Sequence, residues 1–599
     1  MKKILLSIAF ALVGIASGFA AKAYSGIITV TQSDGTELNV RMYGDEHFNW
    51  LTTEDGVLLV QEGNNYYIAE TTSYGTLKAT KFIAHNANKR VSAEIKAIKK
   101  QNHSRFRSYA IEQASTAKAM GTGNNGVKYF PHSGSPKALV ILVEFSDTTF
   151  RSGEKAKNVF EHFLKGKAED ALPDGYEAYT GSYKNKNLLR NKGSVSDYFY
   201  DMSKGTYTPQ FDVVGPYKLN HSSLYYGQGK KDNTYALVSD ACKAADKDVD
   251  FSQYDADGDG MVDLVYIIYA GYPASMSGNP NDIWPKSGPG DGSFGTYDGK
   301  QVCRYGVHAE LNFGWALNKK NGFLLSGIGL FCHEFSHTLG LPDLYPTVDA
   351  SKVDNQNPEM WDLMDGGEYT YNGGYCPTPY SPWELDVMGW TSPVELGDEA
   401  KQVTLNSYYK ERTAYKINGE NDEYLLIQNI QKGGWWNGIA NVYNTGMLIW
   451  RIDYGTKDVN LFDNPNNNIG KPKVMIVPAD GYVISDYNHG DGKQWTDAQY
   501  KESLQGDPFP GATKKTELLS VKLNKSILEK PFYNIKETNG VITFDYLKDF
   551  ATGIDSPVIQ QNQEKDTRIF TLDGRYLGTD VSQLTKGVYI IGKKKVIIK

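Results

Sequence analysis

The chain has 599 residues and a formal net charge of −7 at pH 7. That length favours three or four domains, each with a core of its own. Before the C-terminal end, no basic run exceeds a few residues. The electrostatic footprint of a nucleic-acid-binding protein is therefore missing, and we expect no nucleic acid partner. The 41 tyrosines and 60 glycines favour strands joined by tight turns.

Residues 1–23 have the pattern of a secretory signal peptide. Lysines follow Met1, and an apolar run extends from Ile4 to Val13. Small residues, as a signal peptidase site requires, then follow: Gly18, Ala20, Ala21 and Ala23. The alternative is a membrane anchor, but this run is shorter than the ~20 residues that span a bilayer. We expect the mature chain to have no transmembrane span, to be soluble, and to be secreted or held at the cell surface.

Residues 24–125 have the pattern of a small β-rich unit followed by a connector. Two Asp-Gly pairs, at 34–35 and 55–56, separate runs of alternating apolar residues, as in β-hairpins. From Arg90 to about Tyr129 the chain is polar, with a basic helical patch and then Gly and Asn residues. Such an exposed connector is a place where a protease can cut. We interpret 24–125 as a propeptide.

The rest of the chain divides into three parts. In 126–395, the continuous apolar runs Lys137–Asp147 and Met261–Tyr272 are typical of strands buried on both faces, and helical segments accompany them. This pattern predicts a mixed α/β domain. Residues 396–550 have β texture throughout, with Gly and Asn turns, which predicts a sandwich. Residues 551–599 form a separate small module.

The four cysteines all lie in one central stretch, at positions 242, 303, 332 and 376. In an oxidising compartment they could form two disulfides, in any of three connectivities, or remain buried free thiols. A zinc–thiolate site is not expected, because no two of them have CxxC spacing.

The stretch HEFSHTLGLPD, from His333 to Asp343, carries the strongest chemical signal. Helical residues four apart share a face, so His333 and His337 can present two imidazoles to one zinc ion, with Glu334 beside them. Gly340 would end the helix and let Asp343 supply a third ligand. Such a ligand set leaves a water on the metal, and Glu334 can take its proton as general base. We expect peptide-bond hydrolysis, whereas the alternative is a buried helix that contains histidine by chance.

Further residues support this hypothesis. In MWDLMDGG, Met364 precedes two glycines in a tight turn similar to the methionine turn of metzincin-type proteases, although methionine is also a common core residue. Glu368 competes with Asp343 for the place of third ligand. One phenol could stabilise the transition-state oxyanion, and three tyrosines are candidates: Tyr369, Tyr371 and Tyr375.

The stretch DADGDGMVD resembles a calcium-binding loop. Oxygen ligands at positions 1, 3, 5 and 9, a glycine at position 6 and a backbone carbonyl at position 7 match most of that pattern. The corresponding ligands are Asp255, Asp257, Asp259, Asp263 and the carbonyl of Met261. Tyr266 replaces the glutamate at position 12. We expect a structural Ca²⁺, and the alternative is a solvated acidic turn.

Taken together, these stretches make the sequence resemble the immune inhibitor A type of secreted metallopeptidases. The resemblance rests on HEFSHTLGLPDLY, MWDLMDGG, Ser194–Tyr217, Val249–Gly271, Asp282–Trp284 and Ser381–Trp390, and it extends to shorter stretches on both sides. It implies a zinc endopeptidase made with a propeptide and stabilised by calcium. Its zinc roles carry over to His333, His337, Asp343 and Glu334. Ser336 and Ile430 depart from the family's usual glycine and arginine, and neither is a proposed ligand.

The expected fold is thus multidomain α+β: a metzincin-like α/β zinc protease domain (126–395), a small β-rich N-terminal prodomain and a C-terminal β-sandwich (396–550). The last module looks like a type IX secretion sorting domain, through TLDGRYL, KGVYII and a closing KKVIIK, which implies contact with secretion machinery. A plain β-hairpin cap is the alternative.

Two classes of function remain. The first is an active secreted zinc endopeptidase that acts on proteins or peptides and is kept latent by its propeptide. The second is a catalytically inactive surface adhesin or binding protein on a protease scaffold. Glu334 favours the first, because a decayed scaffold does not need a general base. A carbohydrate-active enzyme is not supported, since no pair of carboxylates can be identified.

Overall fold

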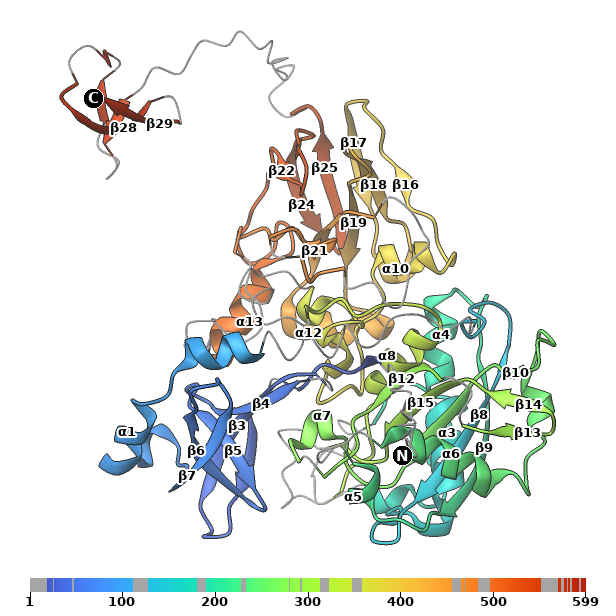
Figure 1. The fold of residues 1–599 in the computed structure, drawn as a ribbon. Coiled ribbons are helices and arrows are strands. Elements are labelled where there is room, and N and C mark those ends of the chain that lie inside the picture. Colours follow the sequence, from blue (N-terminus) through green and yellow to red (C-terminus); the bar gives the residue numbers. More distant parts are fainter. Residues whose placement is uncertain are drawn as a thin grey trace, which may run out of the picture.

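The structure is a computed structural model (Figure 1). It describes residues 19–24, 26–45, 48–110, 128–179, 190–227, 233–279, 281–290, 294–312, 323–346, 358–454, 465–468, 470–482, 496–550, 569–571, 576–578, 580–581, 584–591 and 594–598. Most of the predicted signal peptide, the end of the predicted propeptide and the link to the C-terminal module lie outside these residues. Within them, no helix is both long and apolar enough to cross a membrane.

The N-terminal region folds as a six-stranded antiparallel sheet in which each strand pairs with the next along the chain. Both predicted Asp-Gly turns join neighbouring strands, and Gly35 and Gly56 have φ values of 82° and 88°, which glycine adopts without strain. The elements are β2 (Ile28–Thr31), β3 (Glu37–Gly44), β4 (Asn49–Thr53), β5 (Leu58–Glu62), β6 (Asn65–Thr71), β7 (Leu77–Ile83) and α1 (Ser92–Ile98).

The central region is built on a second six-stranded sheet, in the order β1-β12-β15-β11-β8-β9. Strands β8, β9, β11 and β15 are parallel, whereas β12 and β1 are antiparallel additions at one edge. The strands are β1 (Phe19–Ala20), β8 (Lys137–Glu144), β9 (Gln210–Lys218), β11 (Val265–Tyr269), β12 (Lys286–Pro289) and β15 (Arg304–Ala309). The two predicted buried runs thus supply neighbouring strands, β8 and β11, in the middle of the sheet.

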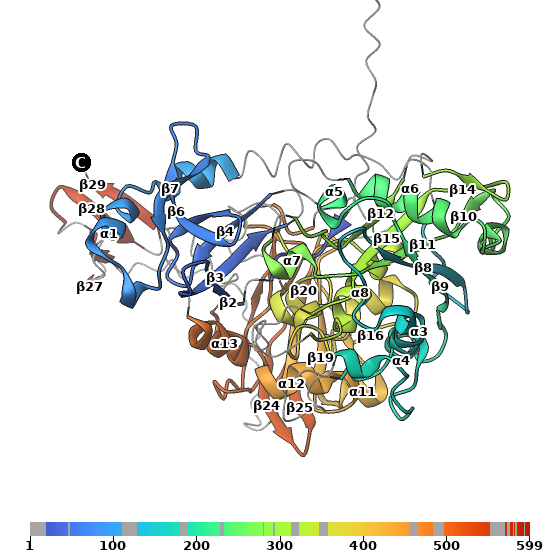
Figure 2. The ribbon, with the colours of Figure 1, turned by 90° about the horizontal axis from the view of Figure 1, so that it is seen from below.

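Two cores cover the two faces of this sheet. Alternate residues of β8 enter different cores: Val140 faces the core that contains α3, α4 and α8, whereas Ile141 faces the core that contains α6. Figure 2 shows these helices on opposite sides of the strands. Burial on both faces accounts for the continuous apolar runs in the sequence. The helices are α3 (Ala156–Lys165), α4 (Val195–Met202), α6 (Thr234–Ala245) and α8 (Ile328–Thr338), with short α5 (Ser223–Tyr226), α7 (Ala274–Ser277) and α10 (Pro382–Val387).

The run Met261–Tyr272 is divided rather than continuous, which corrects the prediction of one strand. Its first two residues form β10 (Met261–Val262) in a separate small sheet with β13 (Thr296–Tyr297) and β14 (Lys300–Val302). The division falls at Asp263, whose backbone N–H donates to the carbonyl of Tyr254 at 2.7 Å instead of to a neighbouring strand. Apolar periodicity does not register such a change of partner.

The region after 393 contains two sheets around one core. The first is β16 (Val394–Glu395), β18 (Tyr415–Asn418), β19 (Tyr424–Ile430), β20 (Gly446–Ile452) and β21 (Val474–Ile476); the second is β17 (Lys401–Leu405), β25 (Val541–Tyr546) and β24 (Phe532–Thr538). Further elements are α11 (Tyr408–Glu411), α12 (Asn437–Tyr443), α13 (Asp497–Gly506), β22 (Val521–Lys522) and β23 (Ile527–Leu528).

The expected boundary at 395 is not a boundary between cores. In β20, Ile449 faces the second sheet, whereas Trp450 enters the core that also contains α8. The aromatic ring of Trp383 in α10 stacks on Tyr454, with centroids 5.1 Å apart. The first sheet is therefore packed on both faces, and the central region shares its largest core with the region after 393, which we call the β region.

The C-terminal module is a four-stranded antiparallel sheet in the order β27-β26-β28-β29. Its strands are β26 (Ile569–Thr571), β27 (Tyr576–Gly578), β28 (Gly587–Ile591) and β29 (Lys594–Ile598). It has more strands than a plain hairpin cap.

All four cysteines are buried free thiols. Of the two alternatives left open by the sequence, the structure therefore has free thiols and not disulfides. Burial raises the pKa of the Cys376 thiol to about 11, which keeps it protonated and unreactive at neutral pH.

We predict that a thiol reagent such as DTNB labels four groups per chain after unfolding and none rapidly in the folded protein. Fewer than four in the unfolded, unreduced protein would contradict this arrangement.

Candidate catalytic metal site

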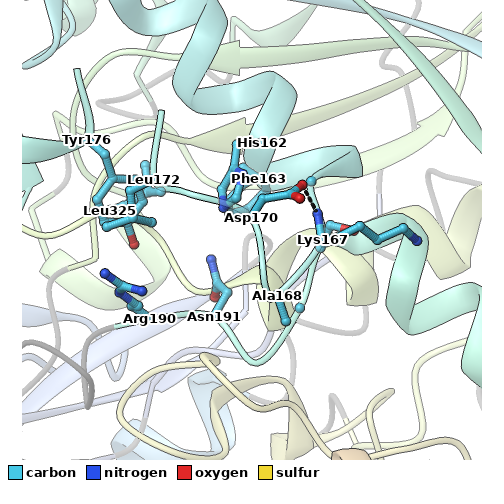
Figure 3. Close-up of a pocket in the computed structure, with 13 residues that line it drawn as sticks. His162, Phe163, Lys167, Ala168, Asp170, Leu172, Tyr176, Arg190, Asn191 and Leu325 are labelled. Carbon is cyan, nitrogen blue, oxygen red and sulfur yellow. Dashed lines mark hydrogen bonds between the residues drawn. The ribbon is translucent and has the colours of Figure 1, made fainter. Parts of the chain in front are cut away.

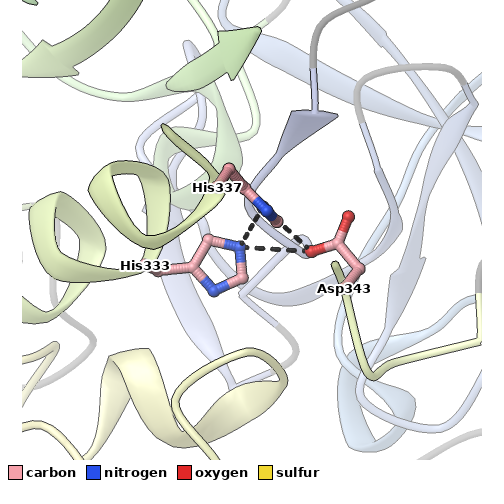
Figure 4. Close-up of side chains that lie close together, drawn as sticks. All are labelled: His333, His337 and Asp343. Carbon is pink, nitrogen blue, oxygen red and sulfur yellow. Dashed lines mark hydrogen bonds and ion pairs between the residues drawn. The ribbon is translucent and has the colours of Figure 1, made fainter. Parts of the chain in front are cut away.

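Helix α8 holds the predicted metal ligands in the interior, because all eleven of its residues are buried. His333 and His337, one turn apart, project from the same face, as Figure 4 shows. After the helix, Gly340 adopts a φ of 103°. A side chain is strained in that conformation, and a Cβ there would also lie 3.2 Å from the ring of Tyr129. The chain can therefore turn back at Gly340 and bring Asp343 to the two histidines.

Three ligand atoms converge at this point. The Nε2 atoms of His333 and His337 lie 3.2 Å apart, and Oδ1 of Asp343 lies 3.3 Å from each of them (Figure 4). Each Nδ1 atom faces a backbone carbonyl, that of Leu363 at 2.9 Å and that of Leu341 at 2.8 Å. A carbonyl oxygen only accepts, so each Nδ1 carries the proton and each Nε2 presents its lone pair.

This donor set fits a divalent cation. Two imidazole lone pairs and a carboxylate oxygen face one another, and Oδ1 of Asp343 is buried without a hydrogen-bond donor in the described part of the chain. Electron pairs that converge without a proton between them repel, and a bound cation removes that repulsion. Two imidazoles and one carboxylate are a ligand set of catalytic zinc sites.

Glu368 occupies a different position from Asp343. Its Oε2 atom lies 3.7 Å from Nδ1 of His333, the ring atom on the side away from the convergence point. Burial raises its pKa well above the usual range of a glutamate. Of the two alternatives for the third ligand, the geometry brings Asp343 to the histidines and keeps Glu368 behind one of them.

Glu334 lies beside the ligands, and its carboxyl is fully buried. Burial raises its pKa to about 8. Oε1 accepts a hydrogen bond from the backbone N–H of Ala21 at 2.6 Å. The backbone carbonyl of Glu334 accepts one from the hydroxyl of Ser287 at 2.8 Å, which ties α8 to strand β12. A carboxyl with a pKa near neutrality is suited to receive and release a proton.

The turn that carries Met364 packs directly against the site. The N–H of Met364 donates to Oδ1 of Asp362 (2.8 Å), and its carbonyl accepts from the N–H of Leu344 (2.8 Å), next to Asp343. The same turn supplies the carbonyl of Leu363 that orients His333. Met364 is itself fully buried in the main core. The tight turn was predicted, and the methionine serves as a core residue beneath the ligands.

The strand at the edge of the site was missed by sequence reasoning, because its residues were assigned to the signal peptide. Residues 19–24, which we call the N-terminal strand, begin with β1, which pairs antiparallel with Lys286 and Ser287 of β12. The indole N–H of Trp284 donates to the carbonyl of Ala21 (2.8 Å), and the hydroxyl of Tyr369 donates to that of Lys22 (2.7 Å). Among the three candidate tyrosines, Tyr369 is the one that reaches this strand, since the hydroxyl of Tyr375 donates to Leu325.

The predicted calcium loop is formed in part. Carboxylate oxygens of Asp255, Asp257 and Asp263 gather within 4.8 Å of one another, while Asp259 lies outside that group and pairs with Lys128 at 3.3 Å. Lysines also neutralise the first two, Lys300 on Asp255 and Lys128 on Asp257, each at 2.6 Å. Met261 begins β10.

The departure at loop position 12 has a physical reason. Tyr266 lies in β11, fully buried, with its ring stacked on Phe331 at a centroid distance of 4.2 Å. The chain has therefore entered the core before it reaches the position of the bidentate glutamate, and no ligand can come from there.

A surface pocket beside the start of α8 contains none of these ligands. Figure 3 shows it, lined among others by His162, Asp170, Arg190 and Asn191. Asn191 accepts a hydrogen bond from the N–H of Ile328 at 3.0 Å, so part of this lining supports the first turn of the helix. The pocket adds no chemical group to the metal site.

Sequence comparisons with known proteins match the part of the chain that contains this site. Residues 128–391 match the family described as immune inhibitor A peptidase M6, catalytic domain. Similar curated proteins include immune inhibitor A of Bacillus thuringiensis (27% identity over 311 residues, 44% of this chain and 42% of that protein) and the pre-pro-metalloprotease PrtV of Vibrio cholerae (22% over 285 residues, 42% and 29%). A putative secreted metallopeptidase of Arthroderma benhamiae is 24% identical over 241 residues, 35% and 34% of the two chains. The chain thus spans less than half the length of these relatives.

The third ligand can be tested by metal content. We predict that Asp343→Ala lowers the affinity for zinc by more than the roughly tenfold to hundredfold typical of losing an outer-shell partner, whereas Glu368→Gln stays within that range. The measurement is zinc content after dialysis against a chelator of known affinity, with circular dichroism to show that each variant is folded. Retention by Asp343→Ala together with loss by Glu368→Gln would reverse the assignment.

Proposed function

We propose that this protein, which carries a peptidase M6 domain, is a secreted zinc endopeptidase that is made as a zymogen and hydrolyses proteins or peptides. The observation that carries the proposal is the convergence of His333, His337 and Asp343 beside the buried carboxyl of Glu334. The match of residues 128–391 to a metallopeptidase family supports it. The Vibrio and Arthroderma relatives are named as a metalloprotease and a metallopeptidase, and the second is also named as secreted.

The roles of the residues follow from their positions. Zinc, when bound by His333, His337 and Asp343, supplies a Lewis acid and a water of lowered pKa. Glu334 accepts the proton of the attacking water on its carboxylate and returns it to the nitrogen that leaves. The contact between Oε1 of Glu334 and the N–H of Ala21 supports this role, because it demonstrates that a backbone nitrogen can lie within hydrogen-bond distance of that oxygen.

Strand β12, which becomes the edge of the sheet once β1 is removed, would align the substrate. A peptide that pairs antiparallel with β12 takes the place of β1 and can use the same hydrogen bonds from Trp284 and Tyr369. Tyr369 then holds substrate backbone, which is a different role from the oxyanion contact considered from the sequence.

The zymogen proposal is supported by the N-terminal strand, which lies where such a peptide would lie. Ala21, Lys22 and Ala23 are buried against the protein. A signal-peptidase cut after Ala20 would keep Ala21, Lys22 and Ala23 in the secreted chain but remove β1, whereas a cut after Ala23, the expected end of the signal peptide, would remove all of these residues. Both cuts follow a small residue, as a signal peptidase requires.

The prodomain also contacts the region after the catalytic domain. Arg41 of β3, whose side chain is almost fully buried, pairs with Asp497 of α13 at 2.7 Å. Figure 1 shows α13 next to the N-terminal sheet. Removal of residues 21–125 would therefore expose the catalytic site and one end of α13 together.

Two further parts of the proposal concern the surface. We assign a structural calcium ion to Asp255, Asp257 and Asp263, with Asp259 and the carbonyl of Met261 as additional expected ligands. We also assign the C-terminal module, residues 551–599, to sorting by the secretion machinery. The four-stranded sheet of this module is compatible with that role but does not identify the machinery. The presence of Glu334 beside the three expected ligands supports the active enzyme over the inactive adhesin alternative.

Replacement of the proposed general base gives the direct test. We predict that Glu334→Ala lowers the rate of casein hydrolysis by about a hundredfold to ten-thousandfold while zinc content is unchanged, because Glu334 is not a ligand. The experiment compares activated wild type and variant, with zinc measured on both. Equal activity would remove this motif as the source of hydrolysis, and absence of both activity and zinc in the wild type would favour the binding-protein alternative.

Calcium is tested by thermal stability. At a calcium concentration of about 100 times Kd, binding to the folded protein adds about 2.7 kcal/mol, so the melting temperature rises by several degrees. We predict that Asp263→Asn removes this response to calcium. Glu154→Gln, which neutralises an exposed acid elsewhere, is the control and keeps it. An identical response in Asp263→Asn would leave the loop as a solvated acidic turn.

A further inference from the structure

We propose that Glu359 and Asp365 form an acidic subsite that selects a lysine side chain at the second substrate residue on the leaving-group side of the cleaved bond. This inference rests on the proposed function, since it concerns the substrate of the same site. The observation behind it is a lysine of the chain itself, Lys22, seated between these two carboxylates.

The subsite is buried and already organised. Nζ of Lys22 lies 3.1 Å from Oδ1 of Asp365 and 3.6 Å from Oε2 of Glu359. Lys22 and Glu359 are each 3% exposed, and Asp365 is not exposed at all. The other oxygen of Asp365 accepts the backbone N–H of Glu359 at 2.8 Å, and Oε2 of Glu359 accepts the hydroxyl of Tyr500 at 2.6 Å. The two carboxylates are therefore held in place by groups other than the lysine.

The register of the N-terminal strand relates the subsite to the reacting bond. In hydrolysis, the general base hands its proton to the nitrogen of the leaving fragment. The nitrogen in contact with Glu334 is that of Ala21, so the bond that occupies the reacting position joins Ala20 to Ala21. Ala21 is then the first residue on the leaving side and Lys22 is the second.

Backbone contacts on both sides of Lys22 keep this register. Trp284 holds the carbonyl of Ala21, Tyr369 holds the carbonyl of Lys22, and the N–H of Ala23 donates to the carbonyl of Gly44 at 2.9 Å. Trp284 and Tyr369 belong to the catalytic region and remain there when the prodomain is removed. A substrate backbone bound by these two residues places its second leaving-side residue at Glu359 and Asp365.

The charges make the subsite selective. An ammonium group that leaves water needs opposite charge and hydrogen bonds at its destination, and two buried carboxylates supply both. An uncharged side chain in the same place would leave the carboxylates facing each other without a cation. Hydrogen bonds to charged groups contribute about 1.5–3 kcal/mol, which corresponds to roughly a tenfold to hundredfold preference. An acidic side chain would be rejected more strongly by repulsion.

The β region contributes Tyr500 to the surroundings of the subsite. It lies on α13, in the β region, yet its hydroxyl holds the Glu359 carboxylate. The nearby indole of Trp361 donates to Asp507, just after the same helix, at 2.7 Å. The β region thus helps to hold the subsite in place. Its close packing on the catalytic region would therefore affect which substrates the enzyme prefers.

The test uses fluorogenic peptides built on residues 19–24, FAAKAY, that differ only in having Lys, Gln or Glu at the fourth position. The enzyme is the full chain, activated by limited proteolysis, and product masses identify the bond cut. For wild type we expect cleavage before the second Ala, with kcat/KM for the Lys peptide about tenfold to hundredfold above that for Gln, and Glu lowest. Asp365→Asn and Glu359→Gln should bring the Lys-to-Gln ratio toward one, whereas the control Glu154→Gln keeps it.

The outcomes separate the two proposals. If wild type hydrolyses casein but cuts the Lys and Gln peptides at equal rates, the subsite is wrong and the proposed function stands. If casein hydrolysis is absent, or is the same in Glu334→Ala, the proposed function fails. A ratio unchanged in folded Asp365→Asn and Glu359→Gln would also overturn the subsite.

A second measurement does not depend on catalysis. In the full chain produced without export, so that residues 1–23 are retained, we expect Lys22→Met and Asp365→Asn each to speed hydrogen exchange at the amides of Ala21 and Ala23 by about tenfold or more, because the lysine no longer anchors the strand. Glu154→Gln should leave exchange unchanged. Exchange that is as slow in both variants as in wild type would show that the carboxylates do not hold the lysine.

Discussion

The burial of α8 is the constraint on which the rest of the structure depends. A helix with two imidazoles and a glutamate on it is placed where every residue is inaccessible to water, so each polar group needs a defined partner. Carbonyl groups of Leu363 and Leu341 accept hydrogen bonds from the Nδ1–H groups, and Oδ1 of Asp343 lies 3.3 Å from each Nε2 atom. The low-polarity surroundings raise the pKa of Glu334 to about 8. The same burial that makes the site costly to build therefore also brings the pKa of Glu334 close to neutrality, as the proposed proton transfer requires.

Continuity of packing links the catalytic region to the β region. Adjacent residues of β20, Ile449 and Trp450, face different cores, and the second of these cores also contains α8. The contacts of Tyr500 with Glu359 and of Asp507 with Trp361 come from the same side of the molecule. A region that could have been an independent appendage is instead part of the surroundings of the metal site. Its removal would be expected to disturb the position of the turn that carries Met364.

Sequence reasoning anticipated the local features and missed the distant partners. The HExxH spacing predicted which residues share a helix face, and the Asp-Gly pairs predicted two hairpins, because both depend on a few neighbouring residues. The choice between Asp343 and Glu368 could not be made, since both follow the helix at distances that allow a return.

The role of residues 19–24 was hidden for a different reason. Small and apolar residues satisfy a signal peptidase and also fit against an edge strand, so composition does not separate the two uses. Asp365 lies within MWDLMDGG and Glu359 directly before it, but nothing local marks either as a binding residue, because Lys22, their partner, lies more than 300 positions away.

By itself, the sequence determined the chemistry available to this protein: a helix with two imidazoles and a carboxylate on one face, a glycine that allows the chain to return, and buried strands that hold the helix. These properties depend on helical periodicity, side-chain type and backbone freedom, all of which are local. Only the tertiary structure decided which carboxylate joins the histidines, that the predicted strand 261–272 is divided, and that a lysine near the N-terminus lies between two buried acids. Those features depend on which distant segments lose water together, and the free energy of that burial belongs to the assembled fold rather than to any one segment.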